Sequence, residues 1–147
     1  MKRFLLGTLA TLGVLLFAFV FEGGNPLNFI LPSPLIITFG MPFFAVLAVW
    51  DFKTWGRAWA DAFAAQTDPA RRQASERLWE FWEKLCYLAG IVGFIAGLTI
   101  IFASAKPDWS IQDFGKYFSV GLISPLLGLC FAIVGRILRY RVTTRGN

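Results

Sequence analysis

The chain has 147 residues, of which 56% are hydrophobic and 16% are charged, and its mean hydropathy is +0.60. This composition is typical of an integral membrane protein and excludes an ordinary water-soluble domain. The formal charge of +5 does not indicate nucleic-acid binding, because most lysines and arginines flank apolar segments.

The first predicted element is a membrane span at residues 4–21. Lys2 and Arg3 precede an apolar run that is longer than the core of a usual signal peptide, and no small-x-small cleavage site follows it. The basic start places the amino terminus in the cytoplasm. A segment rich in glycine and proline follows at 22–34, and we expect an outside loop there, because these residues do not continue a helix.

Residues 35–50 form the second predicted span, which Pro42 interrupts. A proline inside a helix removes one backbone hydrogen bond, so we expect a kink. The amphipathic helical pattern continues past the span, with Trp55, Trp59 and Phe63 on one face. This pattern predicts that the second span extends as a helix into the cytoplasm.

A short cytoplasmic helical hairpin is predicted at 51–84. Asp68 and Pro69 mark a helix start, since aspartate is a good N-cap and proline suits the first helical position. The helix that begins at Pro69 is expected to feed directly into the third span. Six basic and six acidic residues balance each other in the hairpin. This balance is typical of a solvated or subunit-facing surface, and a docking site for a soluble partner is the alternative.

The third and fourth predicted spans, at 86–105 and 117–138, carry small residues at helical spacing. Spacings of three, four and seven place these residues on one face of each helix, where they permit close approach of another helix. We therefore predict that the two spans form a tightly packed pair. The residues assigned to this helix packing are Gly90, Gly93, Gly121, Ala132 and Gly135.

The basic residues are unevenly distributed, since twelve lie on the predicted cytoplasmic side and only Lys106 and Lys116 lie outside. This bias predicts four spans with both termini in the cytoplasm. The predicted fold is an all-α integral membrane protein, with one four-helix membrane domain and the hairpin between spans 2 and 3. Five tryptophans near the span ends are interpreted as interfacial anchors, namely Trp50, Trp55, Trp79, Trp82 and Trp109.

The spans offer little chemistry of their own. No Asp, Glu, Lys, Arg or His lies in the middle of a predicted span; such a group costs roughly 2.5 to 3.5 kcal/mol to insert and usually marks an ion or proton site. Phosphate-binding loops, nucleophile elbows and Cys/His clusters are also missing, and the chain has no histidine. Cys86 and Cys130 are interpreted as packing residues. We expect no enzyme, no cofactor and no metal site.

Hydroxyl groups and one proline are the remaining candidates for a site in the membrane. Serine and threonine in membrane helices mostly bond to their own helix, which is the default interpretation for Thr99 and Ser124. Pro125, however, frees the carbonyl of Gly121 close to the Ser124 hydroxyl. Such a place can face a pore or a partner helix.

Three stretches carry a family resemblance: GGNPLNFILPSPLIITFG with the GRAWADAF segment after it, LAGIVGFIAGLTIIFAS, and VGLISPLLGLCFAIVGRIL. They resemble the second-span start, the third span and the fourth span of the MotA/TolQ/ExbB superfamily of bacterial inner-membrane ion-channel subunits. Within it, the flagellar stator subunit MotA is the most similar. The cytoplasmic insertion of MotA has shrunk here to the short hairpin.

The resemblance implies an assembly and a mechanism. Members of the superfamily form a homo-oligomeric ring, typically a pentamer, in the lipid bilayer around single-span helices of a partner resembling MotB, TolR or ExbD. The partner supplies the proton-binding aspartate. The third and fourth spans of members line the interior, which implies the following candidates for facing the pore or partner: Phe94, Gly97, Thr99, Ser124, Pro125 and Gly128.

Two departures from the family pattern open an alternative. Phe94 stands where members have a threonine, and Ser124 with Pro125 stands where they have a Thr-Thr pair. A phenyl ring removes a water ligand and fills space. The resemblance implies a subunit of a proton- or sodium-driven channel or motor, whereas Phe94 favours a non-conducting oligomeric scaffold that holds lipid or a partner helix. A small transporter is a third class, which the lack of a midplane charge disfavours.

Overall fold

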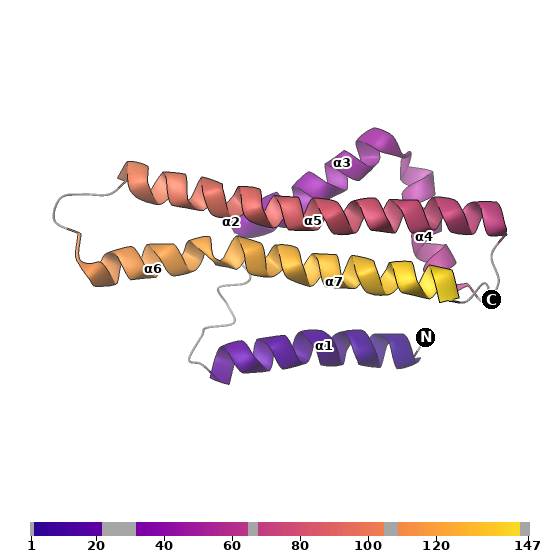
Figure 1. Ribbon diagram of the computed structural model, residues 1–147, viewed down its shortest axis with the longest axis horizontal. Coiled ribbons are helices and arrows are strands. Elements are labelled where there is room, and N and C mark those ends of the chain that lie inside the picture. Colours follow the sequence, from indigo (N-terminus) through magenta and orange to yellow (C-terminus); the bar gives the residue numbers. More distant parts are fainter. Residues whose placement is uncertain (1, 22–31, 65–67, 105–108, 145–147) are drawn as a thin grey trace.

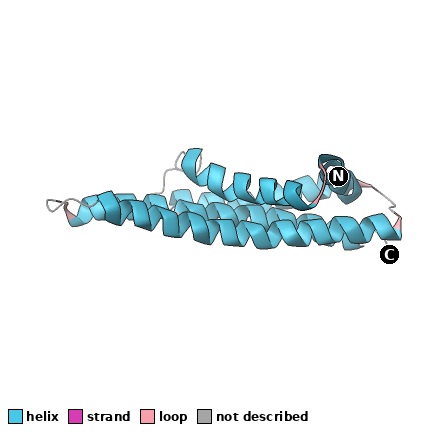
Figure 2. Ribbon diagram, turned by 90° about the horizontal axis from the view of Figure 1, so that it is seen from above, coloured by secondary structure: helices cyan, strands magenta, loops and turns pink. Residues whose placement is uncertain are grey.

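The computed structural model describes residues 2–21, 32–64, 68–104 and 109–144, and these residues contain helices and no strand. The molecule is elongated (Figures 1 and 2). Two long helices, α5 (Pro69–Ser104) and α7 (Ile123–Thr144), lie side by side along its length. Of the predicted loop at 22–34, residues 22–31 lie outside the described residues and residues 32–34 are helical, so the loop prediction is wrong for these three. Residue 1 and residues 65–67, 105–108 and 145–147 also lie outside the described residues.

The first helix, α1 (Lys2–Phe21), coincides with the first predicted span. It lies next to α7, on the side away from α5 (Figure 1). Its large apolar side chains are mostly exposed, with Val14 at 69% and Phe17 at 71%. Such a surface fits a hydrocarbon environment better than water.

The second apolar stretch is helical but irregular. It consists of α2 (Pro32–Leu35), the π-helical turn η2 (Ile36–Gly40) and α3 (Met41–Val49). Pro42 has no amide hydrogen, so the carbonyl of Thr38 lacks its usual helical donor. The π-helical turn ends two residues before this proline, and π-helical geometry occurs mostly as single turns of this kind inside α-helices. The predicted interruption is therefore present as a π-helical turn, which is wider than an α-helical turn.

The prediction that the second span extends onward as a helix is wrong. The helix α3 ends at Val49, Trp50 is extended with φ −125° and ψ 147°, and a new helix, α4 (Phe52–Phe63), begins. Asp51 is its N-cap, with the carboxylate accepting a hydrogen bond from the Thr54 amide at 3.1 Å. An aspartate in this role favours an extended backbone and starts a helix of its own. The helix α4 then crosses α5 and α7 steeply (Figure 1).

The long helix α5 is unbroken over 36 residues and begins at the predicted Pro69. The amide of Arg72 donates to the carbonyl of Asp68 at 2.9 Å. The rise per residue gives α5 a length of about 54 Å, whereas the hydrocarbon core of a bilayer is about 30 Å thick. The helix is therefore long enough to cross a membrane and to project well beyond it.

The fourth predicted span is divided into two helices. The helix α6 (Ile111–Gly121) ends directly before Leu122, and α7 begins directly after Leu122. Pro125 cannot donate to the carbonyl of Gly121, and the amide of Leu126 reaches the carbonyl of Leu122 only at 3.4 Å. The break thus lies at the carbonyl that the proline frees.

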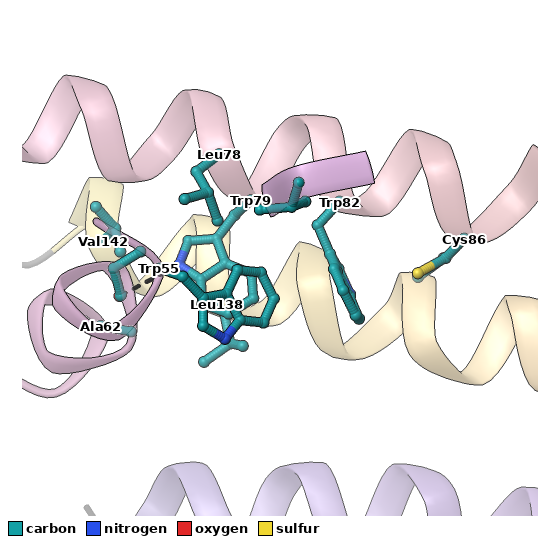
Figure 3. Close-up of a cluster of buried hydrophobic side chains, with 11 residues drawn as sticks. Trp55, Ala62, Leu78, Trp79, Trp82, Cys86, Leu138 and Val142 are labelled. Carbon is teal, nitrogen blue, oxygen red and sulfur yellow. Dashed lines mark hydrogen bonds between the residues drawn. The ribbon is translucent and has the colours of Figure 1, made fainter. Parts of the chain in front are cut away.

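The core is aromatic and lies where α4 crosses α5 and α7 (Figure 3). The rings of Trp55 and Trp82 are 4.9 Å apart, and those of Trp55 and Trp79 are 5.5 Å apart. Leu138 and Val142 of α7 complete the cluster. The three tryptophans are 1–8% exposed. Their interpretation as interfacial anchors is therefore wrong, because they pack against one another inside the chain.

Candidate functional site

The helices α5 and α7 approach each other closely along a seam of small residues. A Cβ atom added to Gly128 would lie 2.6 Å from the Cys86 carbonyl oxygen and 2.9 Å from the Gly90 Cα. A Cβ added to Gly90 would lie 3.2 Å from the Pro125 Cα. The obstructing atoms belong to the backbone, so a larger residue here forces the helices apart.

The seam continues toward α6. A Cβ on Gly93 would lie 2.7 Å from the Cβ of Ser124, which is 4% exposed. Further along, a Cβ on Gly97 would lie 3.3 Å from the Cα of Gly121. Small residues therefore line both sides of the seam, on α5 and on α6 and α7, over several helical turns.

At its other end the seam meets the aromatic core. A Cβ on Gly135 would lie 2.7 Å from Cδ1 of Trp82, and Ala132 is fully buried. The five residues assigned to helix packing are all buried in the structure, namely Gly90, Gly93, Gly121, Ala132 and Gly135.

The residues that the resemblance places toward a pore or partner lie in different surroundings. Ser124 and Gly128 are buried against α5 of the same chain, beside the half-buried Pro125. Thr99 is exposed, and its hydroxyl donates to the carbonyl of Ile95 in its own helix at 2.9 Å. Phe94 is half-buried and packs edge-on against Phe118 at 6.1 Å.

Gly97 is also half-buried, and it lines a groove of about 290 Å³ beside the seam. Walls come from the second apolar stretch, from α5 and from α6, and they include Ile37, Ala96, Ile100, Tyr117 and Val120. The lining is predominantly apolar. Sequence reasoning missed this groove, because it depends on the relative placement of segments that are far apart in the chain.

Two buried carboxylates lie at the opposite end of the molecule. Asp61 of α4 is 5% exposed and accepts hydrogen bonds from Arg71 Nη2 at 2.7 Å and from Ser75 Oγ at 2.8 Å. Glu83 of α5 is 4% exposed and accepts one from Arg136 Nε at 2.7 Å. Each carboxylate is thus paired with an arginine whose own side chain is more than half exposed.

Further contacts hold α7 at this end. Arg139 lies 3.1 Å from Glu80 and 3.8 Å from Glu76. The Arg141 side chain donates to the carbonyl of Ala62 and lies 5.0 Å from the ring centre of Phe63. Four hairpin acids thus serve contacts between helices within the chain, namely Asp61, Glu76, Glu80 and Glu83. Lys53, Arg57 and Arg77 of the same predicted solvated surface are exposed.

The spacing of these charges contained a usable signal. The acids at 76, 80 and 83 recur four and three residues apart, and the arginines at 136 and 139 are three apart. Each set therefore lies on one helical face. Opposite charges on two helices already predicted to pair indicate a contact between them.

The metal-ligating residue types are dispersed in the part of the chain described. No group of three or more His, Cys, Asp or Glu residues there is arranged to hold an ion. Cys86 and Cys130 are both free thiols.

Three helical stretches among the described residues are long and apolar enough to cross a membrane: Pro32–Val49, Pro69–Ser104 and Tyr117–Thr144. They overlap the second, third and fourth predicted spans, whereas α1, the first predicted span, is not among them. The described chain is thus an all-helical protein of the membrane type. Comparison of the chain with protein-family models, with curated proteins and with solved structures found no match.

Proposed function

We propose that this chain is a bacterial inner-membrane subunit of the MotA/TolQ/ExbB kind, which assembles with copies of itself around a single-span partner and supports proton- or sodium-driven work. In this proposal α1 is a fourth span, both termini are cytoplasmic, and α4 with the first half of α5 lies on the cytoplasmic side. The family resemblance of the three sequence stretches supports the proposal.

The observation that carries the proposal is the lack of a proton carrier in the apolar helices. No Asp, Glu, Lys, Arg or His occurs between Leu85 and Ser104 of α5, or between Tyr117 and Gly135 of α6 and α7. Proton relays within membrane proteins are built from Asp, Glu or His side chains. In this proposal a second polypeptide therefore supplies a membrane carboxylate.

The surface of α5 supports an assembly in the membrane. Because the glycine seam is closed within one chain, copies have to meet through other faces. Large apolar side chains remain exposed on α5, between 45% and 64%: Leu88, Ile91, Val92, Ile95, Ile100 and Phe102. Lipid and neighbouring subunits are the two surroundings that such a face accepts.

Proton flux in proteoliposomes tests the proposal. The full chain is reconstituted alone, and then with a single-span protein that carries a membrane aspartate and is encoded beside it. A pH-sensitive dye reports the flux. We expect no flux from the chain alone and flux from the pair, which an aspartate-to-asparagine change in the partner abolishes. Flux through the chain alone contradicts the proposal.

The packing of Phe94 favours a second candidate, a non-conducting oligomeric scaffold. The ring of Phe94 packs against Phe118 of α6 and fills space where the family has a hydroxyl. A scaffold of this kind forms the same oligomer but passes no ions with any partner. The proteoliposome measurement therefore separates the two candidates.

A further inference from the structure

The groove beside the glycine seam exists because small residues form its floor. Ala96, Gly97 and Gly121 contribute little or no side chain there, whereas Ile37 and Tyr117 stand at its sides. Ideal Cβ positions show that the floor is itself tightly closed, since a Cβ on Gly97 would lie 3.3 Å from the Gly121 Cα. The hollow is therefore lateral and does not pass between α5 and α6.

The groove is continuous with the apolar outer surface of the helices. Two of its lining residues, Ile100 and Val120, are 64% and 39% exposed. All three spanning stretches contribute to its lining. In a membrane the medium at its mouth is therefore hydrocarbon, and an apolar hollow of this kind does not hold ordered water.

The size of the groove matches one lipid tail. A cavity of about 150 Å³ holds benzene, so about 290 Å³ has room for on the order of twelve carbon atoms. Along α6 and α7 the groove extends from Tyr117 to Ser124, which is about 11 Å at helical rise. One leaflet of the hydrocarbon core is about 15 Å thick. Spread over about 11 Å, a volume of about 290 Å³ gives a mean cross-section of about 26 Å², whereas a helix about 10 Å in diameter occupies about 79 Å².

A stacked aromatic pair marks one end of the groove. Tyr117, at one end, stacks on Trp109 with ring centres 4.8 Å apart and an interplanar angle of 7°, and Ser33 lies on the same groove. Paired aromatic rings with polar tips are typical of the interface between hydrocarbon and headgroups. At the other end Ser124 packs against Gly93 in the seam.

We infer that this groove binds one acyl chain of a phospholipid from the leaflet at the α6 end. The ester groups lie near Tyr117, and the tail runs toward Ser124. This inference requires that the helices cross the membrane, but it is independent of the ring, the partner and ion flux.

Photolabelling in nanodiscs tests the inference. The full chain is reconstituted with phosphatidylcholine that carries a diazirine near the middle of one acyl chain, and adducts are mapped by peptide mass spectrometry after irradiation. We expect adducts to be enriched at the groove residues Ile37 and Ala96 over Ile91 and Ile95, which are exposed on α5 outside the groove. Equal labelling of the groove and of these exposed positions overturns the inference.

A matched pair of variants adds a second test. Ala96→Phe fills the groove and is expected to abolish its labelling. Ala103→Phe adds the same ring at an exposed position of α5 outside the groove and is expected to leave the labelling unchanged. Persistence of groove adducts in a helical Ala96→Phe protein overturns the inference.

A side chain of a second copy is the competing occupant. A benzophenone amino acid at position 96 distinguishes it, because lipid adducts are expected and chain-to-chain adducts contradict the inference. If Ala96→Phe does not fold, the crosslinking at position 96 and the photolabelling of the wild-type protein still test the inference. A monomeric protein with groove labelling would refute the proposed assembly and leave this site standing.

Discussion

At the residue scale, the glycines of α5 and α7 differ in what stands opposite them. Gly128 faces backbone atoms of α5 within 3 Å of an added Cβ, whereas Gly115 in α6 has nothing within 4 Å. The two positions therefore respond in opposite ways to the same methyl group, although both are helical.

Gly128→Ala is expected to destabilise the protein by roughly 1 to 3 kcal/mol, because the added Cβ overlaps backbone and the helices must separate. Thermal unfolding in nanodiscs measures this. The control is Gly115→Ala, which is expected to raise stability by up to about 1 kcal/mol through helix propensity. Equal midpoints for the two variants would contradict the close contact.

Charged residues at the α4 end also differ in their surroundings. Arg71→Met removes the cation from the Asp61 carboxylate, which keeps only Ser75 as a hydrogen-bond donor among the contacts described. We expect a loss of about 2 kcal/mol, since a hydrogen bond to a buried charge is lost. Lys84→Met, which breaks an exposed pair with Glu80, is the control. Its unfolding midpoint should stay at the wild-type value.

At the element scale, the docking of α4 depends on aromatic packing. Trp79 is 1% exposed and its Nε1 donates to the carbonyl of Ala58 at 3.3 Å. Trp79→Ala is expected to cost about 3 to 5 kcal/mol and to release α4 while α5 and α7 stay paired. Hydrogen exchange by mass spectrometry should show faster exchange in 52–63 but unchanged exchange near Gly90. Uniform acceleration along the chain would contradict separate docking.

The start of α4 is expected to depend on pH. Hydrogen bonding to Thr54 holds the pKa of the Asp51 carboxyl below its usual value of 3.8. A carboxyl with a lowered pKa stabilises the folded state above its unfolded pKa, and this contribution is lost as the pH falls through the lower, folded value. Asp51→Ala should therefore unfold at a lower temperature than the wild type at pH 7.

The difference between Asp51→Ala and the wild type should shrink at pH below about 3.8, the usual carboxyl pKa. Asp51→Asn is the control, because asparagine caps a helix without a titratable group. Its unfolding midpoint should lack this pH-dependent component. A constant difference between wild type and Asp51→Ala at every pH would contradict the capping role.

Local signals predicted some elements well and could not predict others. Pro69 marks a helix start through its fixed φ, and α5 begins there. The change of direction at Trp50 was missed, because the helical period of apolar residues is similar on both sides of it. Asp51 was the available sign of a new helix.

The spacing of residues along the sequence does not show which helix packs against a given helical face. Glycines three and four residues apart predict a close contact but not which helix makes it, and here α5 and α7 of one chain do so. Tryptophans such as Trp79 fit both an interfacial belt and a core. The groove brings together Ile37, Ala96 and Val120, and no local pattern encodes that meeting.

At the scale of the whole molecule, the seam between α5 and α7 is closed within one chain, and the outer faces of the helices remain apolar. The surface around Ile91 and Ile95 of α5 is exposed, and in the proposed assembly lipid and neighbouring copies cover it. The apolar helices carry no acid of their own, so the proposed work requires both an oligomer and a partner.

Native mass spectrometry of the full chain, released from nanodiscs formed directly from the membrane, tests this account most directly. We expect a closed homo-oligomer, with five copies as the number that the resemblance implies, and additional mass from a single-span partner where that protein is co-expressed. A chain that is released only as a monomer, at every activation energy that preserves its bound lipid, would contradict the account.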